Sequence, residues 1–311
     1  MVQEKAIYLG NVISIVEKLM TSAIPKSIML IGLPSTGKTS FLAALWYMVN
    51  QNKVKCALQL DKLEGETRYL NMIRQAWLRY EPVPRNTSDS EVTVRMILQH
   101  KSTHSTLELS VPDLSGESFS LQWATRQCTL QYDMVLRKAK GGILFVHPSN
   151  IVKPIRIDTV MALADSLGGG MSEGDQENSP SQQAASAAWE IAKAPTQVQL
   201  VELLQFVCGR EHFQPPFRLA VVVSAWDIVE HLGKDPKNWI SAELPMLMQF
   251  IESNDAILDA AFYGISAQGV DYVNPGVAEL KKKSPDRRVK LAGDGINNRF
   301  DITEPLQWLL H

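Results

Sequence analysis

The stretch Gly32-Leu33-Pro34-Ser35-Thr36-Gly37-Lys38-Thr39 matches G-x-x-x-x-G-K-[ST], the pattern of the phosphate-binding P-loop. Its two glycines let the backbone bend tightly, so that N–H groups and the positive end of the next helix can surround a polyphosphate. Lys38 would reach the β- and γ-phosphates as a point charge, and the Thr39 hydroxyl would bind Mg²⁺. The predicted nucleotide-binding residues of this stretch are Gly32, Pro34, Ser35, Thr36, Gly37, Lys38, Thr39 and Ser40.

The segments on either side of the loop have the order that a P-loop requires. Residues 27–31 form a short apolar run, which is typical of a buried parallel strand. Residues 40–49 follow the loop and are rich in helix-forming side chains. Strand, loop and helix in this order favour an α/β domain over a chance match in a glycine-containing loop.

The composition is that of an ordinary soluble globular protein. The 311 residues are 45% hydrophobic and 21% charged, and the formal net charge is −2. This balance gives no strong case for binding nucleic acid or an anionic membrane. The three cysteines form no metal-binding pattern and favour a reduced, cytoplasmic protein. No apolar run approaches the length of a membrane span.

Apolar periodicity predicts how the chain is divided. An amphipathic helix over 4–21 would make residues 1–24 an N-terminal helix that precedes a domain over 25–311. The glycine-rich stretch from 168 to 180 indicates a flexible part within an insertion at about 150–213. Residues 270–300 are expected to form a basic, solvated loop.

Further elements follow from alternation and helical period. Strands are predicted at 91–100 and 106–111 as a β-hairpin, and at 143–148, 217–223 and 261–265. Helices are predicted at 66–80, 119–140 and 196–213, and in a last short segment that Thr303 would cap.

An acidic residue follows the predicted hairpin in the sequence Pro112-Asp113-Leu114-Ser115-Gly116-Glu117. A carboxylate just past a strand is where P-loop enzymes hold the acid that supports Mg²⁺. D-x-x-G after an antiparallel hairpin is also the pattern of a loop whose glycine N–H senses the γ-phosphate. Asp113 is therefore a predicted metal residue, and Gly116 and Lys38 are predicted catalytic residues.

Four segments stand in the chain order of the Ras-like GTPases of the TRAFAC class. Residues 32–39 resemble the first motif of that class and residues 113–116 the third. Ser224-Ala225-Trp226-Asp227 stands where N-K-x-D recognises guanine, and Ser266-Ala267 stands where S-A-K closes over the base. The resemblance implies that Asp227, Ser266 and Ala267 bind the base.

The same class implies a threonine that contacts Mg²⁺ and a residue that orients the attacking water. Thr87 is the candidate threonine because it lies in a loop just before the hairpin. Glu117 occupies the place where many members carry a glutamine. A carboxylate there could orient water or act as a base, but its charge could also lie too near the γ-phosphate. We therefore expect slow hydrolysis without a partner.

More narrowly, the chain resembles the bacterial double-GTPase family of GTPase-centred conflict systems. This resemblance implies a cytoplasmic switch that works with partner proteins in anti-phage defence. The segments that carry it are 37–46, 112–119, 224–227, 263–269 and 304–310.

Ser224 and Ala225 depart from the usual Asn and Lys, and the missing lysine would normally lie along the base. Asp227 remains, and a carboxylate can accept hydrogen bonds from both the N1–H and the 2-amino group of guanine. Adenine offers no such pair, so GTP is favoured.

Together these observations predict a three-layer α/β P-loop domain. Its sheet would be mostly parallel, with one antiparallel edge strand. The predicted function is Mg²⁺-dependent binding and hydrolysis of GTP by a switch protein. Two alternatives stay open, namely an ATP-using P-loop ATPase or kinase, and a nucleotide-binding scaffold with little or no turnover.

Overall fold

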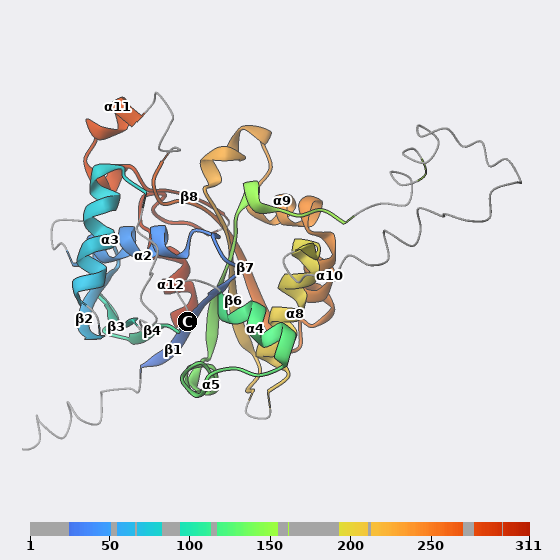
Figure 1. Cartoon of the computed structure of the whole chain (residues 1–311). Coiled ribbons are helices and arrows are strands. Elements are labelled where there is room, and N and C mark those ends of the chain that lie inside the picture. Colours follow the sequence, from blue (N-terminus) through green and yellow to red (C-terminus); the bar gives the residue numbers. More distant parts are fainter. Residues whose placement is uncertain are drawn as a thin grey trace, which may run out of the picture.

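The apolar run before the P-loop forms β1 (Lys26–Gly32), which lies inside an eight-stranded sheet of order β2-β3-β4-β1-β5-β6-β7-β8 (Figure 1). In this computed structural model the P-loop therefore follows a strand in the middle of the sheet. The described residues are 25–50, 55–65, 67–82, 94–112, 117–154, 161, 193–210, 213–269, 277–293 and 295–311.

Five neighbouring strands of the sheet run parallel. They are β4 (Thr106–Val111), β1, β5 (Gly141–Val146), β6 (Phe217–Ser224) and β7 (Leu258–Ser266). A parallel strand that is buried on both faces reads as a continuous apolar run. This is why the sequence predicts β1, β5 and β6 well.

Antiparallel pairs complete both edges. β3 (Val94–His100) pairs with β4 as the predicted hairpin, and β2 (Leu58–Gly65) adds to β3. At the other edge, β8 (Lys290–Gly293) pairs antiparallel with β7. The mostly parallel sheet with an antiparallel edge strand is thus confirmed.

The sequence analysis predicted an antiparallel edge but not the two outermost strands, β2 and β8. β2 carries a register shift between Leu60 and Lys62, which interrupts the alternation that marks a strand. The expectation of a loop over 270–300 is wrong at β8 and at α11 (Val277–Lys281). Both elements are short, and they lie in a basic stretch with little apolar pattern.

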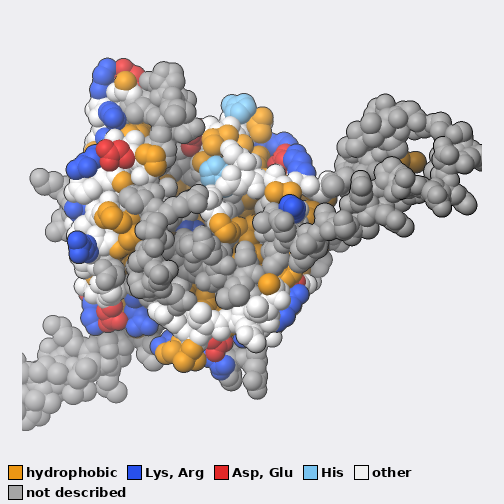
Figure 2. All heavy atoms as spheres, viewed as in Figure 1, with side chains coloured by type: hydrophobic (Ala, Val, Ile, Leu, Met, Phe, Trp, Pro, Cys, Tyr) orange, Lys and Arg blue, Asp and Glu red, His pale blue; other side chains and the backbone are white. Residues whose placement is uncertain are grey.

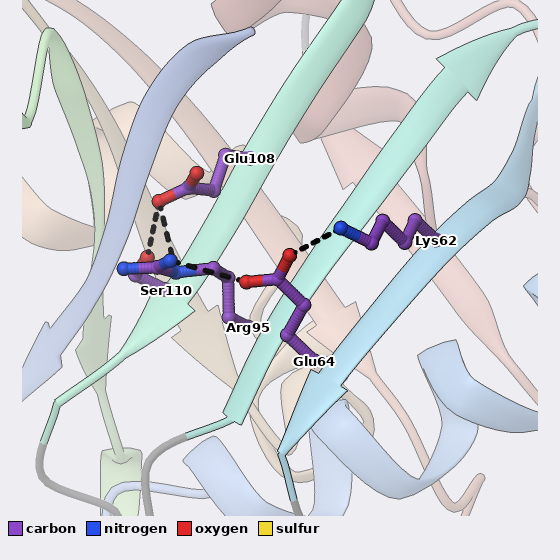
Figure 3. Close-up of polar contacts among 5 residues, drawn as sticks. All are labelled: Lys62, Glu64, Arg95, Glu108 and Ser110. Atoms are coloured by element: carbon purple, nitrogen blue, oxygen red, sulfur yellow. Dashed lines mark hydrogen bonds and ion pairs between the residues drawn. The ribbon is translucent and has the colours of Figure 1, made fainter.

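A polar network ties β2 to the strands beside it (Figure 3). The Arg95 guanidinium lies 3.2 Å from a carboxylate oxygen of Glu64 and 3.3 Å from one of Glu108. Lys62 pairs with Glu64 at 2.6 Å, and the Ser110 hydroxyl donates to Glu108 at 3.2 Å. Charged side chains on an edge also disfavour pairing with another chain.

Alternate residues of the strands build two cores, one on each face of the sheet. One face is covered by α2 (Lys38–Val49), α3 (Thr67–Arg79) and α12 (Glu304–Leu310), whose apolar side chains pack with Ile28 and Leu30 of β1.

Other described helices cover the opposite face of the sheet (Figure 1), and their apolar side chains pack with Met29 and Ile31 of β1. They are α4 (Glu117–Thr125), α5 (Leu130–Lys138), α8 (Thr196–Cys208), α9 (Pro236–Glu243) and α10 (Pro245–Ser253). The predicted three-layer α/β architecture is therefore present.

Two local predictions need correction. The helix expected over 119–140 is divided into α4 and α5, because Arg126 has a left-handed φ of 59° and Thr129 caps a new helix by accepting from Tyr132 N. Thr303 precedes α12 but does not cap it with its side chain. Its hydroxyl donates instead to the Asp301 carboxylate at 2.6 Å.

Two segments within the predicted insertion lie side by side at residues 152 and 196. Val152 N donates to the Thr196 hydroxyl at 2.9 Å, and Thr196 N donates to Val152 O at 2.9 Å. These two bonds join segments that are 44 residues apart in the sequence. α8 itself packs into the helical layer. The division into residues 1–24, residues 25–311 and an insertion at about 150–213 stays a prediction, and the helix over 4–21 lies outside the described residues.

On the face seen in Figure 2, basic and acidic side chains alternate along the rim, with hydrophobic side chains between them. No described helix is long and apolar enough to cross a membrane.

Candidate nucleotide-binding site

The P-loop joins β1 to α2 through a tight bend. Ser35 and Gly37 adopt left-handed backbone conformations, with φ of 58° and 89°. The Thr36 hydroxyl donates to Leu33 O at 2.8 Å and closes the bend from within. Left-handed residues next to right-handed ones turn successive N–H groups toward one side, which is the geometry of an anion-binding nest.

A side chain at Gly37 would be strained here. A Cβ at this position would lie 3.1 Å from both Cβ and Oγ of Ser224, and the left-handed φ adds strain. Gly37 also precedes α2. In the described first turn of this helix there is no side-chain cap and no acidic residue. The positive end of α2 therefore has no acidic side chain of its own first turn beside it, which suits an anion at the P-loop.

Lys38 lies within the loop rather than in solvent, and it is only 3% exposed. Its ammonium donates to Gly32 O at 2.7 Å and to Leu33 O at 2.9 Å. The backbone thus holds a positive charge over the bend. A positive charge at this place suits a phosphate group, because charge-assisted hydrogen bonds to phosphate are strong.

Thr39 contacts Tyr69 of α3. Burial raises the pKa of Tyr69, and a hydrogen bond with the Thr39 side chain lowers it in part. A hydroxyl that donates to the Tyr69 oxygen keeps its own lone pairs for a cation. The side chains present therefore fit the predicted Mg²⁺ ligand at Thr39, since Mg²⁺ binds oxygen atoms and shares the phosphates of its substrate.

A second group of polar side chains follows the carboxyl ends of β6 and β7. Ser224 ends β6, and its hydroxyl donates to Val146 O at 3.1 Å. Ala225 is left-handed with a φ of 45°, and the turn that follows, η3 (Trp226–Ile228), contains Asp227. The Asp227 carboxylate accepts a hydrogen bond from the hydroxyl of Ser266, the last residue of β7.

A cavity of about 330 Å³ joins the two groups. Its walls come from the start of α2, the end of β5 and the loops that follow β6 and β7, which is where ligands bind in an open α/β sheet. Burial lowers the pKa of His147 in this wall, and the nearby Asp227 carboxylate opposes the effect. The lining residues are Gly37, Ser40, Phe41, Phe145, His147, Ser149, Ser224, Ala225, Asp227, Ile228, Ile265, Ser266, Ala267 and Gln268.

Trp226 fixes the turn that carries Asp227, and Gly264 makes room for it. A Cβ on Gly264 would lie 2.3 Å from Cδ2 of Trp226, whose side chain is 3% exposed. We expect Gly264→Ala to lower the free energy of unfolding by about 1–3 kcal/mol through overpacking. Urea unfolding would measure this loss.

The matched control for this prediction is Gly233→Asn. A Cβ at Gly233 meets nothing within 4 Å, and asparagine tolerates its left-handed φ of 67°. Equal stability of the Gly264→Ala protein and the wild type would contradict the packing of Trp226 against β7.

The structure brings five of the described candidates to one cavity, and the remaining P-loop candidates are not among its lining residues. Gly37 and Ser40 from the P-loop segment line it together with Asp227, Ser266 and Ala267. Asp113, Gly116 and Thr87 lie outside the described residues. Glu117 begins α4, but the structure does not describe its side chain. The roles assigned to these residues stay predictions.

Sequence reasoning missed several residues that shape the site. Asn150 of η1 (Pro148–Asn150) donates its amide to Ser35 O at 2.9 Å and so ties a distant turn to the P-loop. Phe41, Phe145 and Ile228 supply apolar walls. A strand, a helix and a turn each supply one of these walls, so no motif marks them in the sequence.

The chain was compared with protein families and with curated proteins. The family model described as Double-GTPase 1 matches residues 29–309. None of the curated proteins matches the chain.

Solved structures were compared as well. The chain is 14% identical to the bacterial selenocysteine-specific elongation factor EF-Sec, with a TM-score of 0.37. The match covers 83% of this chain and 28% of the elongation factor chain. It is 14% identical to a chain of the signal recognition particle receptor SRb-GTP/SRX complex from Chaetomium thermophilum, with a TM-score of 0.38. This match covers 83% of the present chain and 96% of the receptor chain. It is 11% identical to the GTP-bound Ski7 GTPase-like domain from S. cerevisiae, with a TM-score of 0.36. This match covers 86% of the present chain and 51% of the Ski7 chain.

Proposed function

The chain belongs to the Double-GTPase 1 family, and from this premise we propose that it is a Mg²⁺-dependent switch protein that binds and hydrolyses GTP. The observation that carries the proposal is the cavity that joins the P-loop segment to Asp227 and Ser266. One end of this cavity is lined by Gly37 and Ser40, on either side of Lys38, whose ammonium lies over the P-loop bend and would bind phosphates. The other end has a carboxylate for a base that donates two hydrogen bonds.

The proposed preference for guanine depends on how Asp227 is held. Ser266 is 1% exposed, and its hydroxyl donates to Asp227 while accepting from Gly269 N at 3.0 Å. A carboxylate restrained in this way presents its remaining lone pairs in a defined direction. The N1–H and 2-amino group of guanine match such an acceptor pair, whereas adenine would leave it unpaired.

The proposed chemistry is positioning and charge stabilisation, as in other phosphoryl transfers. Mg²⁺, when bound, would neutralise charge that develops on the phosphate oxygens, and Thr39 and Asp113 would hold it, with Thr87 as a further candidate. Lys38 would move from its carbonyl partners to the β- and γ-phosphates. Gly116 would contact the γ-phosphate through its N–H, and Glu117 would orient the attacking water.

The biological setting is also a proposal. We propose that the loops around Thr87 and 113–119 respond to the γ-phosphate, so that partner proteins distinguish the GTP and GDP forms. The family resemblance supports a cytoplasmic bacterial switch in a conflict or anti-phage system.

Phosphate release from GTP tests the proposed hydrolysis. We expect slow release that needs Mg²⁺ and stops when EDTA is added. Glu117→Ala should slow release by roughly 10-fold or more without changing GTP affinity, because positioned acid–base groups typically contribute 100-fold or more. An unchanged rate in this variant would remove Glu117 from the mechanism. Tight GTP binding with no release under any condition would favour the scaffold alternative.

A further inference from the structure

Helix α3 reaches the base-binding end of the cavity, although it lies far from that end in the sequence. The indole N–H of Trp77 donates to Ala267 O at 2.8 Å. Trp77 is 1% exposed, and the centroid of its ring lies 5.3 Å from the ring centroid of Tyr47 on α2. The position of the Trp77 indole is therefore restrained by packing against Tyr47 and by its hydrogen bond to the Ala267 carbonyl.

Ala267 belongs to the loop that follows β7 and lines the cavity. Just before this loop, Ser266 at the end of β7 is restrained by Asp227 and Gly269, so its contacts come from the strands and loops of the base-binding end itself. The contact from Trp77 comes instead from the helical layer beside the P-loop helix. Indole is a donor only, and a buried N–H without an acceptor is costly, so this bond strongly favours one position of the Ala267 carbonyl.

We propose that Trp77 is a positioning residue for base recognition, because its indole N–H orients the Ala267 peptide so that the backbone N–H groups of the loop face O6 of guanine. This inference rests on the proposed function, since it assumes that a guanine nucleotide occupies the cavity. It makes α3 part of the specificity of the site, although α3 contains none of the recognition motifs.

The test compares GDP with 6-thio-GDP, which replaces the oxygen at position 6 with a weaker acceptor. Trp77→Phe keeps an aromatic ring but removes the indole donor. We expect this variant to bind GDP about fivefold to tenfold more weakly, the size of one lost hydrogen bond. Its affinity for 6-thio-GDP should change little, so the preference for GDP should largely disappear.

Trp46→Phe is the matched control. The Trp46 indole N–H donates to Asn71 Oδ1 at 3.2 Å, so this hydrogen bond joins α2 to α3 and not to the base-binding loop. This variant should match the wild type in its GDP preference. Calorimetric binding and thermal unfolding of all three proteins would separate recognition from stability.

The possible results separate the role of Trp77 from guanine binding itself. Equal weakening of GDP and 6-thio-GDP in Trp77→Phe, or no weakening, would overturn the role of Trp77 and leave guanine binding intact. A wild-type protein that binds ADP as tightly as GDP would overturn both.

A measurement on the wild-type protein keeps the test valid if Trp77→Phe does not fold. Among the seven tryptophan indole N–H resonances, the one assigned to Trp77 should shift on addition of GDP and shift much less with 6-thio-GDP. No shift with GDP would contradict the proposal.

Discussion

Lys38→Ala is expected to raise the Kd for GTP by about 100-fold or more and to abolish measurable turnover. Lys38 would make charge-assisted hydrogen bonds to two phosphates, and each such bond contributes roughly 1.5–3 kcal/mol. A tenfold change in affinity corresponds to about 1.4 kcal/mol. Isothermal titration with GTP and a phosphate-release assay would measure both effects.

Lys26→Ala is the matched control for this variant. It removes a lysine from the opposite end of the same strand, β1, and should leave GTP affinity unchanged. Because Lys38 also satisfies two backbone carbonyls, thermal unfolding of both variants should accompany the titration. Full GTP affinity and full turnover in a folded Lys38→Ala protein would refute the phosphate site.

Asp227→Asn is expected to change the base that the protein prefers. The amide oxygen can still accept from Ser266 and from the N1–H of a purine, but the amide NH₂ now faces the 2-position. It opposes the 2-amino group of guanine and matches the 2-oxo group of xanthine. We expect GTP affinity to fall by roughly 100-fold or more and XTP to bind better than GTP, because unpaired polar groups at a recognition site are strongly discriminated against.

Asp235→Asn is the matched control for this exchange. Asp235 caps α9 by accepting from Asn238 N at 2.9 Å, and asparagine caps helices equally well. This control should bind GTP like the wild type. Competition titrations with GTP, XTP and ATP would compare the three proteins. Unchanged base preference in Asp227→Asn would show that Asp227 serves only as part of the turn after β6.

The sequence predicts the centre of the fold better than its edges. β1, β5 and β6 are continuous apolar runs, so burial on both faces leaves a clear signal. β2 and β8 pair at the edges, where charged side chains and a register shift hide the strand pattern. The break between α4 and α5 depends on one left-handed residue, Arg126, which helical periodicity does not reveal.

The same contrast applies to the site. The P-loop and Asp227 are local motifs, and the fold places them around one cavity as chain order predicts. The contacts that hold them are long-range and could not be predicted. Asn150 supports Ser35, Tyr69 contacts Thr39 and Trp77 supports Ala267, and each contact joins elements that only tertiary packing brings together.

The most direct test of guanine nucleotide recognition is a side-by-side titration of the wild-type protein with GTP and ATP in the presence of Mg²⁺. We expect GTP to bind at least about tenfold more tightly, because Asp227 and the loop after β7 recognise the guanine base. Equal binding of the two nucleotides, or tighter binding of ATP, would contradict it. In that case the segment from Ser224 to Asp227 would be only the end of a strand, and the shared P-loop would be all that remains of the site.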